Sequence, residues 1–363
     1  MADTRRPKPK PKSKEPFYAV SPLWKDVIPV PLIDGPPGQK DPGPALATIA
    51  YSPRYSEAMS YLRAVMAINE FSRRALDLTE DIIGMNPAHY TVWLYRAKIL
   101  KTLWQEEGMT VEDGVTTELD WLEGISERNL KNYQIWHHRQ TLISLLETLP
   151  PTEPAFLAHI LSFDAKNYHV WTYRQWLCRR FPDPLLVTDM ELRAVDALID
   201  DDVRNNSAWN HRYFVVFGVE ELRTIEASAT KIRKEVLASG SLVVDLDVAD
   251  REINYAKDHI AWAPQNASAW NYLRGVLTRA GMPITEMRVF CEGFVGGRGA
   301  NLMSEGGTIR SSHAIDWLAD IYRLEGDVKR SRECLDALAR KWDPIRRKYW
   351  EYRARQLEGE ATK

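Results

Sequence analysis

Apolar and polar positions between residues 55 and 363 alternate with the spacing of amphipathic helices. A representative stretch is PLLVTDMELRAVDALIDD, residues 184–201, in which Leu186, Met190, Val195 and Leu198 form an apolar stripe. Such stretches alternate with shorter segments centred on tryptophan. The pattern predicts helical hairpins, each made of an outer amphipathic helix followed by an inner helix that carries the tryptophan.

The tryptophan segment is a repeat. Its copies read NPAHYTVWLYR, NLKNYQIWHHR, DAKNYHVWTYR, DVRNNSAWNHR and APQNASAWNYLR, and a weaker copy, DPIRRKYWEYR, follows near the end. The first four tryptophans are spaced by 43, 35 and 38 residues: Trp93, Trp136, Trp171 and Trp209. A period of about 35–40 residues is typical of stacked helical hairpins. We therefore expect an all-α fold, an alpha-alpha superhelix of stacked helical hairpins, with these tryptophans in its core.

Polar residues at fixed places define the start of each inner helix. Asn86, Asp164, Asp202 and Asp343 have side chains that suit a helix N-cap, and proline follows the first and the last of them. Asparagine and tyrosine then precede the tryptophan, as in Asn132–Tyr133 and Asn167–Tyr168. On stacked hairpins these helix starts share one edge, and helix N-termini favour anions. The polar groups either cap their own helices or face a partner and an anionic ligand.

Proline and glycine divide the chain into regions. Twelve of the 21 prolines lie at or before Pro53, and proline lacks the amide proton that a helix needs. We expect a disordered basic tail over residues 1–16, an extended proline-rich segment over 17–54, and the hairpin solenoid over 55–363. Six of the 19 glycines fall within residues 290–307 without a phosphate-loop motif, so a flexible surface insertion is expected at about 290–310.

Charge and cysteine usage exclude several classes of protein. The net charge of −2 disfavours nucleic-acid binding, and a membrane span is not expected because no run of 18 apolar residues is present. Cys178, Cys291 and Cys334 lie far apart without a CxxC pair, and the adjacent His137 and His138 cannot share a helix face. We therefore expect a cytoplasmic protein in which this chain holds no metal, and we place the two histidines near a subunit contact or a helix surface.

The N-x-Y-x-x-W-x-x-R copies resemble the repeats of protein prenyltransferase alpha subunits. The segments DVIPVPLIDGPP (Asp26–Pro37) and YLRAVMAINEFSRRALDLTEDII (Tyr61–Ile83) are similar to the alpha subunit, of the fungal kind, shared by protein farnesyltransferase and type I protein geranylgeranyltransferase. The similarity extends from about Trp24 to Arg353 and is weak from Ala280 to Ser312. It implies a heterodimer in which a crescent of hairpins surrounds a beta subunit. That partner holds the catalytic zinc and most of the isoprenoid pocket, and magnesium is expected in the farnesyl form.

The resemblance also implies a reaction and its residues. The enzyme transfers a farnesyl or geranylgeranyl group from its diphosphate to the cysteine of a C-terminal CaaX sequence, as in Ras-like and Rho-like GTPases. Lys166 corresponds to the lysine whose ammonium stabilises the charge that grows on the leaving diphosphate. Tyr168 corresponds to the hydroxyl beside the diphosphate and the peptide, while Tyr133 and His169 correspond to peptide-side contacts. Three further matching positions are interpreted as structural, a cap, a hydrogen-bonding fork and a stacking ring: Asn205, Arg174 and Trp209.

Other functions fit the residues less well. The alternative is a non-catalytic scaffold of the tetratricopeptide kind, which a period near 35 also suggests, but the copies lack the W-x₂-L-G-x₂-Y pattern. An RNA-reading repeat is disfavoured because the chain has no basic face. The related alpha subunit that acts on Rab proteins is disfavoured by the segment at Asp26–Pro37 and by the absence of an appended domain. The identity of the isoprenoid depends on the beta subunit.

Overall fold

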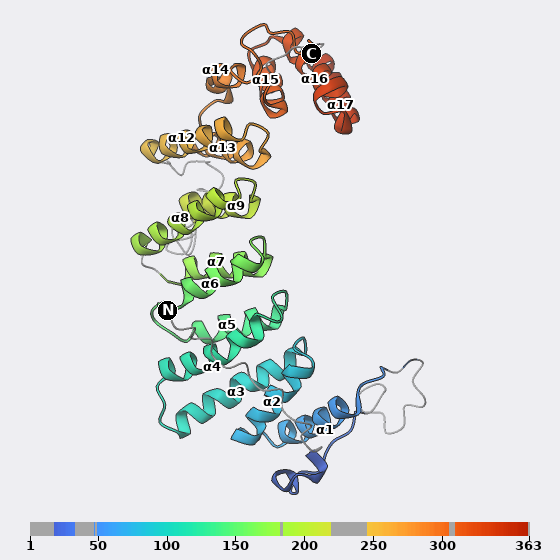
Figure 1. Cartoon of the computed structure of the whole chain (residues 1–363), viewed down its shortest axis with the longest axis vertical. Helices are drawn as coiled ribbons and strands as arrows, with labels where there is room; N and C mark the ends of the chain where they lie inside the picture. Colours follow the sequence, from blue (N-terminus) through green and yellow to red (C-terminus); the bar gives the residue numbers. More distant parts are fainter. Residues whose placement is uncertain are drawn as a thin grey trace, which may run out of the picture. The chain divides into compact units, whose positions relative to one another are not determined.

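The computed structural model describes residues 18–32, 47, 49–181, 184–218, 245–304 and 309–361 (Figure 1). The basic tail expected over residues 1–16, and residues 33–46 of the proline-rich segment, lie outside this range. Throughout the described residues the ordered elements are helices, so the all-α class of stacked hairpins is confirmed. None of these helices has the length and apolarity needed to cross a bilayer. The chain divides into two compact units, Met1–Glu153 and Pro154–Lys363.

The described residues of the first unit form two short 3₁₀ turns and five long helices. These are η1 (Tyr18–Val20), η2 (Pro22–Trp24), α1 (Pro53–Ala67), α2 (Arg73–Met85), α3 (Tyr90–Glu106), α4 (Val111–Ser126) and α5 (Tyr133–Ile143). Helices α2 and α3 form one hairpin, and α4 and α5 form the next. Side-chain caps begin α1, α2 and α4, where Ser52, Ser72 and Thr110 each accept a hydrogen bond from a backbone N–H one turn ahead.

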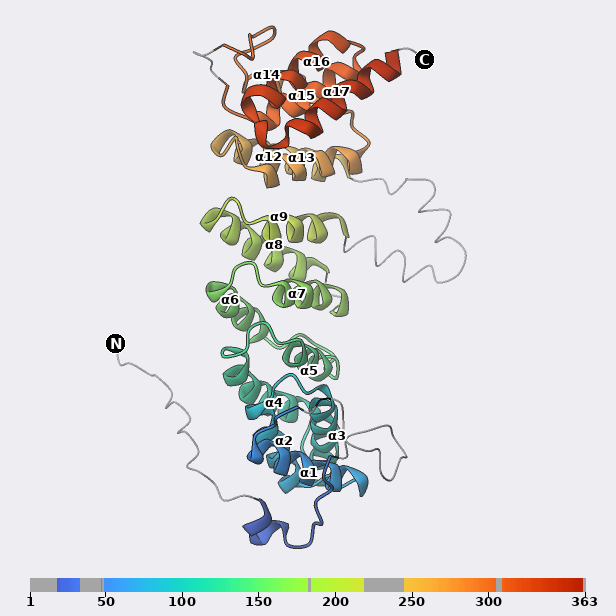
Figure 2. The same ribbon diagram turned by 90° about the vertical axis from the view of Figure 1, so that its right-hand side faces the viewer.

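The second unit continues the hairpin pattern after α6 (Glu153–Phe163), a helix whose first residue still belongs to the first unit. The hairpins are α8–α9, α12–α13 and α15–α16, and α17 packs on α16 (Figures 1 and 2). After α6, the helices and short helical turns of this unit have these bounds: α7 (Tyr168–Arg180), α8 (Pro184–Asp201), α9 (Asn206–Tyr213), η3 (Phe214–Gly218), α12 (Leu246–Trp262), α13 (Ala267–Ala280), η4 (Ile284–Met287), α14 (Arg288–Glu292), α15 (Ser312–Leu324), α16 (Val328–Ala337), η5 (Leu338–Trp342), η6 (Pro344–Arg346) and α17 (Arg347–Ala361).

Residues 18–32 begin with two 3₁₀ turns rather than the extended run expected there. Trp24 is buried against the rings of Tyr18 and Tyr61, each 5.4 Å away between centroids. Arg74 on α2 donates to both carboxylate oxygens of Asp26, at 2.7 and 2.9 Å. The N–H of Val30 then donates to a carbonyl of α1 at 3.0 Å. Aromatic packing and charge-assisted hydrogen bonds thus fasten this segment to α1 and α2.

One local expectation, the apolar stripe of the outer helix α8, is partly wrong. Among the described side chains of this helix the buried ones are Glu191, Val195 and Ile199. The stripe therefore passes through Ile199 rather than Leu198. The side chain of Leu186, the first residue expected in the stripe, lies outside the described part of the chain.

The glycine-rich segment differs from its prediction in its first part, where Phe294 is buried against Trp270. Residues 296–304 are exposed or half-buried, and the carbonyl of Leu302 among them accepts the ring N–H of Trp342 at 2.8 Å. Glycines at positive φ allow this segment to turn within the packed structure: Gly296, Gly297 and Gly299.

Candidate functional site at the starts of the motif helices

Asparagine side chains cap most of the helices that carry the tryptophan motif. The Oδ1 of Asn132, Asn167 and Asn205 each accepts two backbone N–H groups from the first turn, at 2.8–3.3 Å. Asn266 caps α13 in the same way, through the N–H of Ser268 at 3.1 Å. In the first copy His89 stands at this position, and its side chain makes no capping hydrogen bond. The asparagines therefore serve their own helices.

The residues expected as N-caps begin a tight turn instead. The side-chain oxygens of Asn86, Asp164 and Asp202 accept the N–H two residues ahead, at 3.2, 3.3 and 2.9 Å. Each helix begins only after the asparagine or histidine three residues later. The sequence prediction was wrong because both residue types favour turns as well as caps. Asp343 does precede a helical turn, η6, but makes no side-chain capping hydrogen bond there.

A single backbone carbonyl joins consecutive repeats. In the first five copies the ring N–H of the motif tryptophan donates to the carbonyl six residues before it; for Trp171 this is the carbonyl of Ala165, at 3.0 Å. The same Ala165 carbonyl accepts from Nδ2 of Asn205, the cap of the next motif helix, at 3.3 Å. One repeat further on, the carbonyl of Val203 accepts from Trp209 and Asn266 at 2.8 and 2.6 Å. The buried tryptophans and the caps thus fix the loops that precede the motif helices.

Three of the predicted site residues lie together at the start of α7. Lys166 is in the loop that ends at Asn167, and 57% of its side chain is exposed. Tyr168, the first residue of α7, is 65% exposed, and its ring meets that of His169 edge-on with centroids 5.6 Å apart. Tyr133 begins α5 in the first unit and is 66% exposed. The structure therefore presents two tyrosine rings and one ammonium to the outside at the starts of their helices.

Arg174 is the hydrogen-bonding fork that the sequence analysis expected. Its Nε and Nη2 donate to the two carboxylate oxygens of Glu191 on α8, both at 3.0 Å. The Nε2 of His211 on α9 lies 2.7 Å from the same carboxylate. Burial alone raises the pKa of Glu191, but the His211 hydrogen bond and the Arg174 charge lower it to about 2. Burial lowers the pKa of His211, so the imidazole is neutral at pH 7.

The same arrangement recurs in the first unit. Arg96 donates to Glu118 at 2.6 and 2.8 Å, and Nε2 of His138 lies 2.9 Å from that carboxylate. His138 is therefore buried inside a hairpin stack, not at a subunit contact or helix surface, whereas His137 is exposed. Two further pairs follow the pattern, Arg139 with Glu153 and Arg212 with Glu252. Each carboxylate pairs with the motif arginine of the inner helix that precedes it. Three of the carboxylates also form a hydrogen bond with a side chain of the inner helix that follows: Glu118, Glu191 and Glu252.

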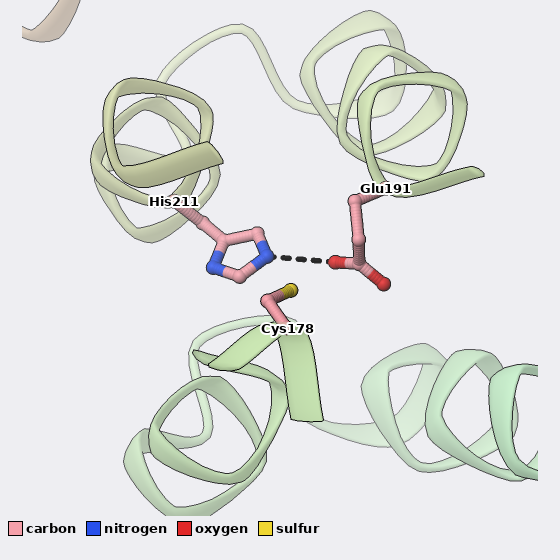
Figure 3. A group of neighbouring side chains, drawn as sticks. All are labelled: Cys178, Glu191 and His211. Carbon is pink, nitrogen blue, oxygen red and sulfur yellow. Dashed lines mark hydrogen bonds and ion pairs between the residues drawn. The ribbon is translucent and has the colours of Figure 1, made fainter. Parts of the chain in front are cut away.

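Cys178, Glu191 and His211 are a cluster that sequence spacing did not reveal (Figure 3). Their donor atoms lie within 4.8 Å of one another, and all three residues are buried. The chemistry of the set does not suit a metal, because both oxygens of Glu191 are engaged by Arg174 and burial raises the pKa of the Cys178 thiol. In the matching group of the first unit, the residue four places after the arginine is Leu100 instead of a cysteine. The cluster is therefore explained as packing around an ion pair.

Comparisons with known proteins agree with this architecture. Five segments match the protein prenyltransferase alpha subunit repeat, at residues 72–103, 115–146, 150–181, 188–218 and 249–280. The chain is thus a helical-repeat protein of the prenyltransferase alpha-subunit class.

Full-length relatives narrow the class. The protein farnesyltransferase/geranylgeranyltransferase type-1 subunit alpha of Candida albicans is 38% identical over 320 residues, covering 86% of this chain and 92% of the relative. The subunit of the same name from Dictyostelium discoideum is 32% identical and covers 93% and 92%. A chain of the solved Candida albicans protein geranylgeranyltransferase-I complexed with GGPP superposes with a TM-score of 0.72 at 36% identity, covering 92% of this chain and 97% of that one. This chain belongs to the family of alpha subunits of protein farnesyltransferase and type-1 geranylgeranyltransferase.

Proposed function

We propose that this chain is the alpha subunit of a heterodimeric CaaX prenyltransferase and supplies Lys166 to the reaction. In that reaction the substrate cysteine, its thiol proton lost to solvent, uses a lone pair of the thiolate sulfur to form a bond with C1 of the isoprenoid. The bond from C1 to the diphosphate oxygen breaks, and the diphosphate leaves with the electron pair. The high coverage of the named relatives supports the proposal, as does the structural neighbour, an enzyme complexed with GGPP.

The observation that carries the chemical role is the exposed ammonium at the start of α7. Lys166 stands in a loop that is fixed through Ala165 and Asn167, and its side chain remains available to an anion. A positioned ammonium stabilises diphosphate more strongly as the leaving-group charge develops than before it does. Tyr168 follows Lys166 by two residues and is exposed, and we propose that its hydroxyl contacts the diphosphate and the peptide. We assign His169 and Tyr133 to the peptide side.

We propose that the metals of the reaction are bound by the beta subunit and by the diphosphate rather than by this chain. The donor set of Cys178, Glu191 and His211 does not suit zinc, so we assign the zinc, which activates the substrate thiol, to the beta subunit. Magnesium is proposed to accompany the diphosphate in the farnesyl form. The partner's identity decides which isoprenoid is used. Substrates would be CaaX-ending proteins such as Ras-like and Rho-like GTPases. The compartment we propose is the cytoplasm, since all three cysteines carry free thiols.

Native mass spectrometry with zinc analysis tests this function. The chain is purified by an affinity tag from its own cells without chelators. We expect a one-to-one complex with a second chain of similar size and one zinc per complex. A zinc-free monomer, or a mixture of unrelated partners, would instead support the tetratricopeptide-like scaffold.

The role of Lys166 is tested in the isolated complex. Lys166→Ala is expected to leave folding and assembly intact and to lower turnover on the order of 10²–10³-fold, as for a lost donor to a developing anion. Lys131→Ala provides the control, because Lys131 precedes the capping asparagine Asn132 just as Lys166 precedes Asn167. Normal turnover of the Lys166 variant would remove this residue from the chemistry.

A further inference from the structure

The ammonium of Lys166 has a partner from the next repeat. Its Nζ lies 3.1 Å from Oδ2 of Asp202, in the turn between α8 and α9. The two side chains are 57% and 42% exposed. An ion pair this open to solvent adds little to stability. Its main consequence is to hold a long, flexible side chain in one direction.

Asp202 is itself firmly placed. Its second carboxylate oxygen, Oδ1, accepts the backbone N–H of Arg204 at 2.9 Å. Its backbone carbonyl accepts the N–H of Asn205 at 2.8 Å, and its own N–H donates to the carbonyl of Leu198 at 3.1 Å. One carboxylate oxygen therefore fixes the turn while the other meets the lysine. The Lys166 hydrogen bond and the Arg204 N–H lower the pKa of Asp202, so the carboxylate is charged at neutral pH.

Hydrogen bonds also link the backbone around Lys166 to the turn that contains Asp202. The N–H of Lys166 donates to Oδ1 of Asp164 at 3.3 Å. The preceding carbonyl, that of Ala165, accepts from Asn205, which follows Asp202 by three residues. Asn205 is fully buried, and its hydrogen bond to Ala165, which links the two turns, is partly buried. The distance between the backbones of Lys166 and Asp202 is thus set by the repeat itself.

We infer that Asp202 is the positioning residue of Lys166. The carboxylate accepts one of the three ammonium N–H groups and leaves the other two free to donate to diphosphate oxygens. A lysine held in this way loses less conformational freedom when the charge on the leaving group develops. The inference rests on the proposed function, because it concerns how the lysine of that site is aimed.

The test uses the complex with the beta subunit and measures single-turnover transfer to a CaaX peptide. Asp202→Asn is the informative change, because the amide oxygen still accepts from Arg204 while the amide NH₂ that faces Lys166 cannot accept a hydrogen bond. We expect the rate constant of transfer to fall about tenfold, with the Kd for the isoprenoid diphosphate changed less than threefold, since lost orientation affects the rate more than binding. Glu325→Gln, which removes the carboxylate partner of Arg288 in the same unit, is the matched control and should leave both values unchanged.

A second pair of variants distinguishes the positioning role of Asp202 from the proposed catalytic role of Lys166. In a Lys166→Ala background, Asp202→Asn should have no further effect, because the residue that it positions is gone. An equal rate loss in both backgrounds, or a normal rate for Asp202→Asn alone, would overturn the positioning role. A normal rate for Lys166→Ala would instead refute the proposed role of the lysine itself.

Discussion

The carboxylate of Glu191 links two successive motif helices, so its charge is the most informative one to remove. Glu191→Gln keeps the size of the side chain but removes the negative charge that balances Arg174, which is 4% exposed. The carboxylate now accepts two hydrogen bonds from Arg174 at 3.0 Å and one from His211 at 2.7 Å. The amide can still accept one of them, but its NH₂ group must then face another donor.

The size of the effect follows from the buried charge that remains. Removing one partner of a buried ion pair costs about 3–5 kcal/mol, and we expect the lower end because one acceptor is retained. With an unfolding entropy of about 2.1 cal/mol/K per residue, each kcal/mol lowers the midpoint temperature of this 363-residue chain by about 1.3 °C, so a loss of about 3 kcal/mol corresponds to roughly 4 °C. This is a large part of a typical stability of about 5–15 kcal/mol.

Thermal unfolding, at one fixed protein concentration, measures the effect. The control is Glu351→Gln, which removes the exposed partner of Arg347 on α17 and should change stability by less than about 1 kcal/mol. The double variant Arg174→Met/Glu191→Gln removes both charges and should lose at least about 1 kcal/mol less than the sum of the single losses. A Glu191→Gln midpoint within about 2 °C of the parent, or additive losses in the double variant, would refute the view that this pair is a buried link between repeats.

Two further predictions concern side-chain packing in the first unit and the titration of a histidine in the second. A Cβ on Gly114 would clash with the ring of Trp104, whereas Gly124 in the same helix has open space. Gly114→Ala should therefore cost about 1–3 kcal/mol, while Gly124→Ala gains up to about 1 kcal/mol. Equal midpoint temperatures for the two variants would contradict this. Because burial lowers the pKa of His211 and its Nδ1 has no hydrogen-bond partner among the described residues, the unfolded chain binds a proton more readily than the folded one below its ordinary pKa of 6.5. The free energy of unfolding should thus fall as the pH drops below about 6.5, and His211 contributes up to ~1.4 kcal/mol per pH unit to this fall. In His211→Gln the dependence of stability on pH should be weaker between about pH 6.5 and 5. An unchanged dependence would show that His211 is not its source.

Much of the fold could be predicted because tryptophan repeats are local patterns. Trp93 and its counterparts recur at a nearly constant spacing, and the residues that hold them occupy fixed positions around them. Asn167 and Asn205 also cap their own helices, as was predicted for Asn205, although the sequence analysis expected Asp164 and Asp202 to be N-caps as well. Both residue types satisfy backbone N–H groups at short range, so sequence alone does not separate a turn from a cap.

The exposed site could be located but not assembled from the sequence. The family resemblance pointed to Lys166, Tyr168, His169 and Tyr133, and the structure places the first three at one helix start. Nothing in the spacing indicated the partner of Lys166. Asp202 follows it by 36 residues, and the two are neighbours only because one repeat stacks on the next.

The buried carboxylates show most clearly where sequence patterns fail. Glu191 lies on the buried stripe of α8 with Val195 and Ile199, yet a polar residue at such a place shifts the apparent stripe onto the half-buried Leu198. Its partner cannot be found by spacing either, because the arginine and its glutamate are 22, 14, 17 and 40 residues apart in successive repeats. Two features together identify such pairs. The first is a glutamate that continues a row of apolar residues spaced four apart on an outer helix, and the second is a Trp-x-x-Arg motif on the inner helix before it. A buried carboxylate requires a cation, and in a stack of repeats the available cation is the motif arginine of the preceding inner helix.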